Sequence, residues 1–260
     1  MTRIIAVTNQ KGGVGKTTTC VNLAASLAAN RKRVLLVDLD PQGNATVGAG
    51  IDKDGLTITN YELLMGEAEA PEVCVTVENG GFDVLPANGD LTAAEVALLE
   101  TDARERRLAA ALEGVSADYD HIIIDCPPSL NILTVNALVA ATCVLIPIQC
   151  EYYALEGLTA LLNTIRRVQQ TANPALEIEG LLRTMFDPRN NLANQVGAQL
   201  IAHFNEQVYR TQIPRNVRLA EAPSHGRPAL QYDRASRGAI AYMALASELL
   251  RRERRAAASA

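Results

Sequence analysis

Residues 10–18 form a glycine-rich stretch that constrains the fold of this chain more than any other segment. They read QKGGVGKTT, which keeps the second glycine and the lysine of the phosphate-binding pattern GxxxxGK[ST], but places Gln10 where its first glycine belongs and adds Lys11. In such a loop, backbone N–H groups surround the phosphates of a nucleoside triphosphate, the lysine contacts the β- and γ-phosphates, and a hydroxyl coordinates Mg²⁺. We therefore predict a nucleotide site built from Gly12, Gly13, Val14, Gly15, Lys16, Thr17 and Thr18.

Lys11 places a second cation at the edge of this site, in addition to Lys16. Two like charges so close together repel each other unless an anion lies between them. The natural target of the Lys11 side chain is therefore a phosphate group.

The segments on either side of the loop fit a nucleotide site. Residues 4–8 are an apolar run typical of a buried parallel strand, and residues 17–29 continue as a helical segment rich in alanine and leucine. A strand, a glycine turn and a helix thus follow in the required order, and the helix N-terminus directs its free N–H groups toward the phosphates. The alternative is a glycine-rich turn with two surface lysines, which leaves this order unexplained.

The rest of the chain predicts one large α/β domain. Of the 260 residues, 48% are hydrophobic, and apolar strands such as residues 34–37 and 122–124 alternate with helical stretches. This pattern favours a P-loop NTPase fold, with a mainly parallel twisted sheet and helices on both faces. We expect residues 1–250 to form a single ATPase domain and residues 251–260 to form a tail that is first basic and then rich in small residues. The sequence has no signal-peptide or membrane-span pattern, so we expect a cytoplasmic protein.

Carboxylates follow two of the expected strands, one leading into Asp38 and Asp40 and the other ending at Asp125. Carboxylates at the ends of parallel strands lie on the ligand edge of the sheet. We predict that Asp125 holds the water shell of Mg²⁺ opposite the Thr17 hydroxyl. We expect one of Asp38 and Asp40 to support the loop while the other orients the attacking water, and we assign the water to Asp40. The alternative is that these residues are only turn formers at strand ends.

Three motifs carry a family resemblance. Residues 11–17 (KGGVGKT), 38–44 (DLDPQGN) and 125–128 (DCPP) resemble the deviant Walker A, A′ and B motifs of the ParA/Soj partitioning ATPases. The wider family includes MinD and the nitrogenase iron protein. The resemblance extends from Ile4 to about Leu250, which is nearly the whole chain.

The resemblance implies an ATP-dependent homodimer that encloses two Mg²⁺-ATP molecules between its subunits. The residue matching Lys11 reaches across to the ATP phosphates of the partner, in agreement with the electrostatic argument above. The residue matching Gly12 lies at the close contact between subunits, where a side chain does not fit. We accordingly expect Lys11, Lys16 and Asp40 to carry catalysis.

The resemblance also implies an adenine pocket, which residue spacing alone does not indicate. Residues 181–196 and 213–223 resemble the chromosomal Soj-type members in particular. The matching positions are Met185, Pro214 and Asn216, where an amide pairs with the edge of the base and the other residues pack on its face. Asn216 has an alternative role as a loop cap, because asparagine favours such positions.

DNA binding is the implied property that the overall composition indicates least. The net charge of −5 makes the whole molecule repel DNA at long range, so a DNA site has to be a local patch. The resemblance implies non-specific double-stranded DNA binding through the residues matching Arg189 and Arg218, although isolated arginines are often only solvated surface. The tail offers further candidates, which a helix end would also explain, since cations are favoured there: Arg251, Arg252, Arg254 and Arg255.

The implied function is an ATPase switch in chromosome or plasmid partition, associated with the nucleoid and reset when a ParB-type DNA-binding activator stimulates hydrolysis. An alternative is a MinD-like membrane-associated ATPase, but the C-terminus lacks the apolar-faced helix that this requires. A reductase with a metal cluster fits poorly, because the five cysteines include no C-x-x-C pair and suit reduced core thiols: Cys20, Cys74, Cys126, Cys143 and Cys150. A metabolic kinase needs an acceptor domain, for which this length leaves little room.

Overall fold

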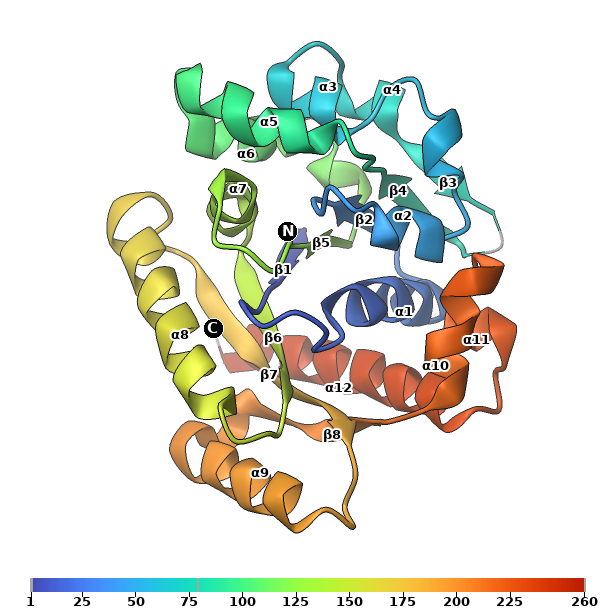
Figure 1. Ribbon diagram of the computed structural model, residues 1–260, viewed down its shortest axis with the longest axis vertical. Coiled ribbons are helices and arrows are strands. Elements are labelled where there is room, and N and C mark those ends of the chain that lie inside the picture. The colour runs from blue at the N-terminus through green and yellow to red at the C-terminus, as the bar shows by residue number, and fades with distance from the viewer. Residues whose placement is uncertain (1, 79, 260) are drawn as a thin grey trace.

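A β-sheet runs through the middle of the protein, in a computed structural model that describes residues 2–78 and 80–259 (Figure 1). Within these residues the sheet has eight strands in the order β3-β4-β2-β5-β1-β6-β7-β8. All neighbouring strands are parallel except β3, which is antiparallel to β4. The strands are β1 (Arg3–Val7), β2 (Val34–Asp38), β3 (Val75–Val77), β4 (Phe82–Leu85), β5 (His121–Asp125), β6 (Cys143–Gln149), β7 (Glu177–Phe186) and β8 (Val208–Pro214).

Helices cover both faces of this sheet, which confirms the predicted fold class. Alternate residues of β1 point to opposite faces, so Ile5 and Val7 join one apolar core while Ile4 and Ala6 contact the other. The first core is shared with α1, α2 and α10 to α12, and the second with α3 to α9. The helices are α1 (Lys16–Ala29), α2 (Asn44–Gly48), α3 (Asn60–Met65), α4 (Ala70–Val73), α5 (Leu91–Ala97), α6 (Arg107–Glu113), α7 (Ile132–Ala140), α8 (Ala154–Thr171), α9 (Asn191–Phe204), α10 (Val217–Glu221), α11 (Ala229–Tyr232) and α12 (Arg237–Ser259).

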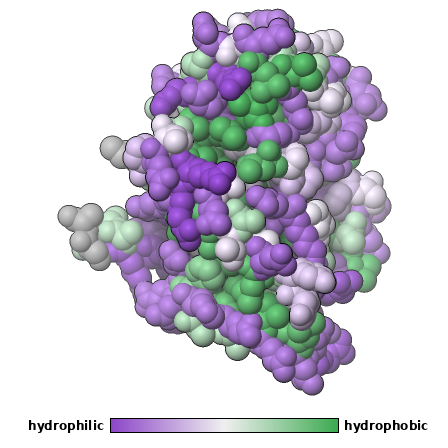
Figure 2. All heavy atoms as spheres, turned by 60° about the vertical axis from the view of Figure 1, so that its left-hand side comes forward, coloured by the Kyte–Doolittle hydropathy of each residue, from purple (hydrophilic) through white to green (hydrophobic). Residues whose placement is uncertain are grey.

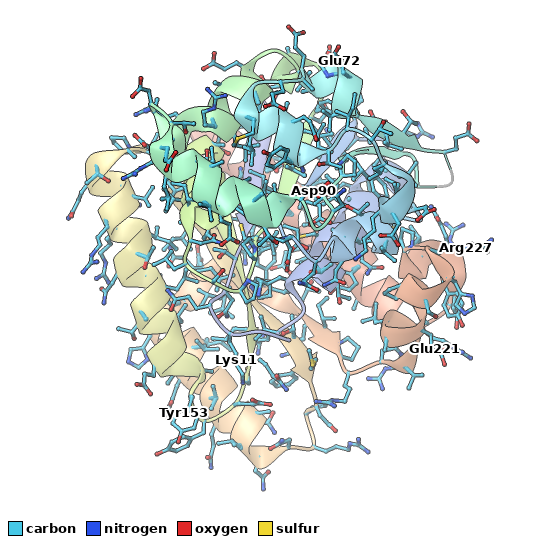
Figure 3. The ribbon with its side chains drawn as sticks, turned by 45° about the horizontal axis from the view of Figure 1, so that its top comes forward. Lys11, Glu72, Asp90, Tyr153, Glu221 and Arg227 are labelled. Carbon is cyan, nitrogen blue, oxygen red and sulfur yellow. The ribbon has the colours of Figure 1, made fainter. Side chains whose placement is uncertain are left out.

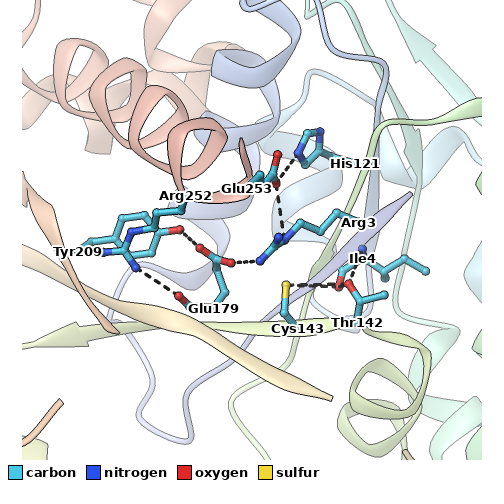
Figure 4. A network of polar contacts seen from close by, with 9 residues as sticks. All are labelled: Arg3, Ile4, His121, Thr142, Cys143, Glu179, Tyr209, Arg252 and Glu253. Atoms are coloured by element: carbon cyan, nitrogen blue, oxygen red, sulfur yellow. Dashed lines mark hydrogen bonds and ion pairs between the residues drawn. The ribbon is translucent and has the colours of Figure 1, made fainter. Parts of the chain in front are cut away.

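Residues 251–259, expected as a tail, continue α12, so the expected boundary at residue 250 falls inside a helix. This last part of α12 lies against the N-terminal ends of the strands (Figure 4). The Arg252 guanidinium stacks 3.8 Å from the centre of the Tyr209 ring and forms an ion pair of 3.1 Å with Glu248. Glu253 Oε1 lies 2.9 Å from Nε2 of the buried His121. These contacts tie the end of α12 to the sheet.

Glu248 on α12 covers the edge of β8. Its carboxylate accepts hydrogen bonds from the backbone N–H groups of Arg210 and Thr211, each at 2.9 Å, and from the Thr211 hydroxyl at 2.7 Å. Unpaired N–H groups on an edge strand are otherwise open to other chains. Burial acts to raise the pKa of Glu248, but the hydrogen bonds from Thr211 and Arg210 and the charge of Arg252 outweigh it and lower this pKa.

We expect Glu248→Ala to lower the free energy of unfolding by about 3 kcal/mol, because partly buried N–H donors and a cation lose their acceptor. Urea denaturation at neutral pH measures this change. The control is Glu206→Ala, which makes the same substitution at an exposed position. Because the folded-state pKa lies below the usual 4.5, the Glu248 contribution is present above pH 4.5 and is lost as pH falls below it. The difference between wild type and variant should therefore shrink in acid; a constant difference would contradict the role of the charged carboxylate.

Candidate nucleotide site at the carboxyl edge of the sheet

Strand order brings the predicted site residues to one edge of the sheet. β1 lies between β5 and β6, and β2 lies on the other side of β5. Because these strands are parallel, the loops that follow them emerge together at their carboxyl ends, where α/β proteins bind ligands. The glycine-rich loop, Asp40, Asp125 and the start of α8 are therefore neighbours.

The glycine-rich loop turns sharply between β1 and α1. Gly13 and Gly15 have φ angles of 71° and 87°, in the left-handed region that favours glycine. Gly15 is the N-cap, so α1 begins at Lys16, one residue earlier than expected, and its first backbone N–H groups have no partner within the helix. The Val14 carbonyl accepts a 2.8 Å hydrogen bond from the Thr184 hydroxyl, which fastens the loop to β7.

Lys16 is the buried cation of this loop. It is only 7% exposed, and its Nζ donates to the Lys11 carbonyl oxygen at 3.3 Å. A charged ammonium group buried with so few partners suits an anion that supplies the missing contacts. The loop therefore brings together the Lys16 cation, the free N–H groups at the start of α1 and a tight turn at Gly13 and Gly15.

Asp38 and Asp40 have different surroundings. Asp38 is completely buried, and its carboxylate accepts hydrogen bonds from the Thr46 N–H and hydroxyl, both at 2.8 Å, and from the Asp40 N–H at 3.1 Å. It thereby fixes the turn that leads into α2. Asp40 accepts one hydrogen bond from the Gln42 N–H at 3.0 Å and is 9% exposed. Of the two carboxylates, Asp38 supports the loop, which leaves Asp40 for the predicted contact with water.

Asp125 is buried at the end of β5, directly beside Asp38 at the end of β2. One carboxylate oxygen accepts from the Cys20 thiol at 3.4 Å, and the other, Oδ2, has no hydrogen-bond partner within residues 2–78 and 80–259. Burial, followed by the charge of Asp38, raises the pKa of Asp125, while the nearby Thr17 hydroxyl and Cys20 thiol oppose this rise. A buried carboxylate oxygen without a partner, next to a threonine hydroxyl, fits a Mg²⁺ site because the cation supplies the missing positive charge.

Lys11 forms an ion pair that sequence reasoning missed. Its Nζ lies 2.5 Å from Oε2 of Glu151, in the bend between β6 and α8, and the two side chains are 45% and 47% exposed. Figure 3 shows Lys11 on the loop close to the start of α8, where Tyr153 lies. Glu151 is 140 positions away in sequence, so no local pattern indicates the pair.

The residues expected at the adenine lie at the ends of β7 and β8. The register pairs Phe186 with Pro214, which brings Met185 close to Pro214. Met185 has a φ of 48°, uncommon for a residue with a side chain and often found at functional positions. Asn216 caps α10 by accepting from the Arg218 N–H at 3.1 Å, so the alternative cap role is present in the structure, while the adenine contact stays a prediction.

Three of the candidate DNA-binding arginines, Arg189, Arg218 and Arg252, are paired with acidic residues. The Arg189 side chain is 88% exposed and binds Asp187 at 2.8 Å, which lowers the pKa of Asp187 to about 2 through their hydrogen bonds. Arg218 binds Glu221 at 2.7 Å and Asp233 at 3.3 Å. Arg251 is exposed, whereas Arg252 is held in the contacts described above. The predicted DNA role is therefore favoured less for Arg252 than for Arg189, Arg218 and Arg251.

Comparisons with known proteins agree with this geometry. Residues 2–178 match the AAA domain family. The chain is similar to the sporulation initiation inhibitor protein Soj of Bacillus subtilis, with 57% identity over 96% of this chain and 98% of the relative. It is also similar to the chromosome partitioning protein ParA of Myxococcus xanthus, with 55% identity over 96% of this chain and 89% of the relative. A crystal structure of cobyrinic acid a,c-diamide synthase from Mycobacterium smegmatis with bound ATP analogue and magnesium has a TM-score of 0.85 and 42% identity, over 98% of this chain and 96% of that one.

Proposed function

Because the chain belongs to the AAA-domain family of Soj and ParA chromosome-partitioning ATPases, we propose that it is an ATP-driven switch for DNA partitioning. Two subunits dimerise around two Mg²⁺-ATP molecules, bind double-stranded DNA without sequence preference, and separate after hydrolysis stimulated by a ParB-type DNA-binding protein. The main observation in favour is the position of Lys11, a second lysine on the phosphate-binding loop whose side chain is half-exposed and accessible from outside the subunit.

The proposal assigns parts in ATP binding and hydrolysis to residues of the loop and to the carboxylates beside it. Lys16 and the first N–H groups of α1 contact the phosphates, and Thr17 and Asp125 hold the Mg²⁺ with its water shell. Magnesium neutralises charge on the phosphates when it is bound with ATP. Asp40 accepts a hydrogen bond from the attacking water and orients it toward the γ-phosphate.

The surface around Lys11 supports a contact with a second subunit. Leu130, Tyr152 and Tyr153 follow β5 and β6 and are 49%, 77% and 71% exposed. Figure 2 shows that apolar side chains interrupt the polar surface in patches on the side of α8. Exposed apolar groups beside a functional site mark interaction surfaces. Among the described residues, a Cβ atom added at Gly12 would meet nothing within 4 Å, so a requirement for glycine there would come from a partner subunit or from the bound nucleotide.

Dimerisation couples ATP binding to DNA binding. A dimer carries two copies of each arginine patch, and phosphate contacts add through counterion release, so it binds DNA far more tightly than a subunit with net charge −5. A switch that has to persist between signals hydrolyses ATP slowly until its activator arrives. The proposed location is the cytoplasm, at the nucleoid.

Charge reversal tests the DNA contact. We expect Arg189→Glu and Arg218→Glu each to weaken ATP-dependent DNA binding and to leave dimerisation intact. If each arginine neutralises one phosphate per subunit, the slope of log affinity against log salt falls by about two per dimer, with a coefficient near 0.9 per contact. Filter binding over a salt series measures the slope, with Arg166→Glu on the exposed side of α8 as a control of equal charge.

An unchanged slope in both variants would remove these arginines from the DNA site and leave Arg251, Arg254 and Arg255 as candidates. Affinity should also be alike for unrelated DNA sequences, since phosphate contacts carry no base information. Liposome flotation and DNA co-sedimentation, each measured with ATP, distinguish this proposal from a MinD-like membrane switch. The proposal predicts co-sedimentation with DNA, whereas the membrane switch predicts flotation with liposomes. Among residues 2–78 and 80–259, no helix is long and apolar enough to cross a membrane.

A further inference from the structure

The ion pair between Lys11 and Glu151 is the most specific contact at the site that the proposed function leaves unused. The bend that carries Glu151 is itself ordered by hydrogen bonds, from the Glu151 N–H to the Gln149 carbonyl at 2.8 Å and from the Ala154 N–H to the Glu151 carbonyl at 3.0 Å. The carboxylate is therefore presented to Lys11 from a defined position at the start of α8.

The backbone of Lys11 is held by its own subunit as well. Its N–H donates to Asn9 Oδ1 at 3.0 Å, and the Asn9 amide donates in turn to the Pro147 carbonyl at 2.8 Å. Its carbonyl oxygen accepts from Lys16 Nζ at 3.3 Å. Both the main chain and the side chain of Lys11 thus lie against β6 and the residues that follow it.

The Lys11 ammonium group directs a donor to its own Glu151 at 2.5 Å, and this carboxylate competes for its charge with a phosphate in another subunit. We propose that Glu151 is a positioning residue that holds Lys11 against its own subunit and so weakens the association of ATP-bound subunits into dimers. This inference rests on the proposed function, because it takes Lys11 as the residue that reaches the ATP of the partner. The pair opens when a phosphate of higher charge replaces the carboxylate.

The structure allows the pair to open without unfolding. Both side chains are about half-exposed, and exposed ion pairs are weak. Glu151 also lines a cavity of about 280 Å³, together with Arg215 and Met185. Arg215 is exposed, and it offers the released carboxylate another cation.

The test compares Glu151→Gln, which removes the charge and keeps the size, with the wild type. We expect the variant to dimerise on the order of tenfold more tightly, because each exposed ion pair contributes up to a few-fold and two pairs open per dimer. Sedimentation equilibrium over a protein concentration series, with saturating ATPγS and Mg²⁺, measures the dimer dissociation constant. The matched control is Glu156→Gln, an exposed glutamate in the first turn of α8, which changes the net charge equally.

Two further variants separate this inference from the proposed function. Glu151→Asp keeps the charge and should stay within a few-fold of the wild type, whereas Lys11→Ala should form no dimer. If Lys11→Ala fails to dimerise but Glu151→Gln matches Glu156→Gln, the restraint by Glu151 is wrong and the cross-subunit lysine stands. A weaker dimer in Glu151→Gln also overturns the inference, since Glu151 then contacts the partner. If the wild type forms no dimer, the proposed function and this inference both fail.

Discussion

Asp40→Ala is expected to lower ATP hydrolysis by at least about a hundredfold, the usual scale for loss of a proton acceptor or orienting group, while ATP binding and dimerisation persist. The carboxylate is 9% exposed, and it accepts a hydrogen bond from the Gln42 N–H, which leaves acceptor capacity for a water molecule. Phosphate release measured over single and multiple turnovers, with saturating ATP, gives the change.

Asp40→Asn is the matched control for structure, because the amide keeps the size and an oxygen for the Gln42 N–H but cannot take a proton. It should lose hydrolysis as Asp40→Ala does and bind ATP like the wild type. Hydrolysis near the wild-type rate in both variants would move the role to another residue. Asp38 is a poor substitute, because its two oxygens already hold Thr46 and the Asp40 N–H.

Substitutions of the two loop lysines are expected to have different effects on ATP binding. Lys16→Ala should weaken ATP binding by at least about a hundredfold, since a buried cation with charge-assisted hydrogen bonds to phosphate is lost. Lys11→Ala should bind ATP in the monomer with nearly wild-type affinity, because Lys11 points to Glu151 at the rim of the site. Titration with a fluorescent ATP analogue at protein concentrations too low for dimerisation measures both affinities.

The central fold could be predicted because its signals are local in sequence. Residues 122–124 read as an apolar strand with the carboxylate of Asp125 at its end, and β5, His121–Asp125, covers these residues. β1 lies one residue earlier than the predicted 4–8, since Arg3 pairs with His121 in spite of its charge. α1 starts one residue early because the left-handed Gly15 ends the turn there. Such errors of one residue leave the order of strand, loop and helix unchanged.

The assignment of loop support to Asp38 and of the water to Asp40 goes beyond what the sequence pattern specifies. In an extended chain, residues two positions apart lie on the same face, so the different surroundings of the two side chains do not follow from alternation. The inward position of the Asp38 side chain depends on Thr46, whose backbone and hydroxyl donors lie where α2 begins. That position follows from the turn of the chain after Asp40, which no periodic pattern specifies.

Contacts between distant segments could not be predicted from the sequence. Glu151 meets Lys11 only because β6 lies next to β1 in the sheet. The C-terminal arginines read as DNA-binding candidates or as a helix end, and α12 does continue to Ser259, but the stacking of Arg252 on Tyr209 had no signal in the sequence. The ion pair between Arg189 and Asp187 could have been predicted, because the two residues are only two positions apart in the sequence.

The most direct test of the ATP-driven dimer is the molar mass of wild type and Lys11→Ala by light scattering after size exclusion, in ADP and in a non-hydrolysable ATP analogue. The wild type should have a mass near 27.9 kDa in ADP and near twice that value in the analogue. Lys11→Ala should remain a monomer in both, although it binds the nucleotide. A full dimer of Lys11→Ala in the analogue would contradict the cross-subunit role of Lys11, and a wild type that stays monomeric in the analogue would contradict the switch itself.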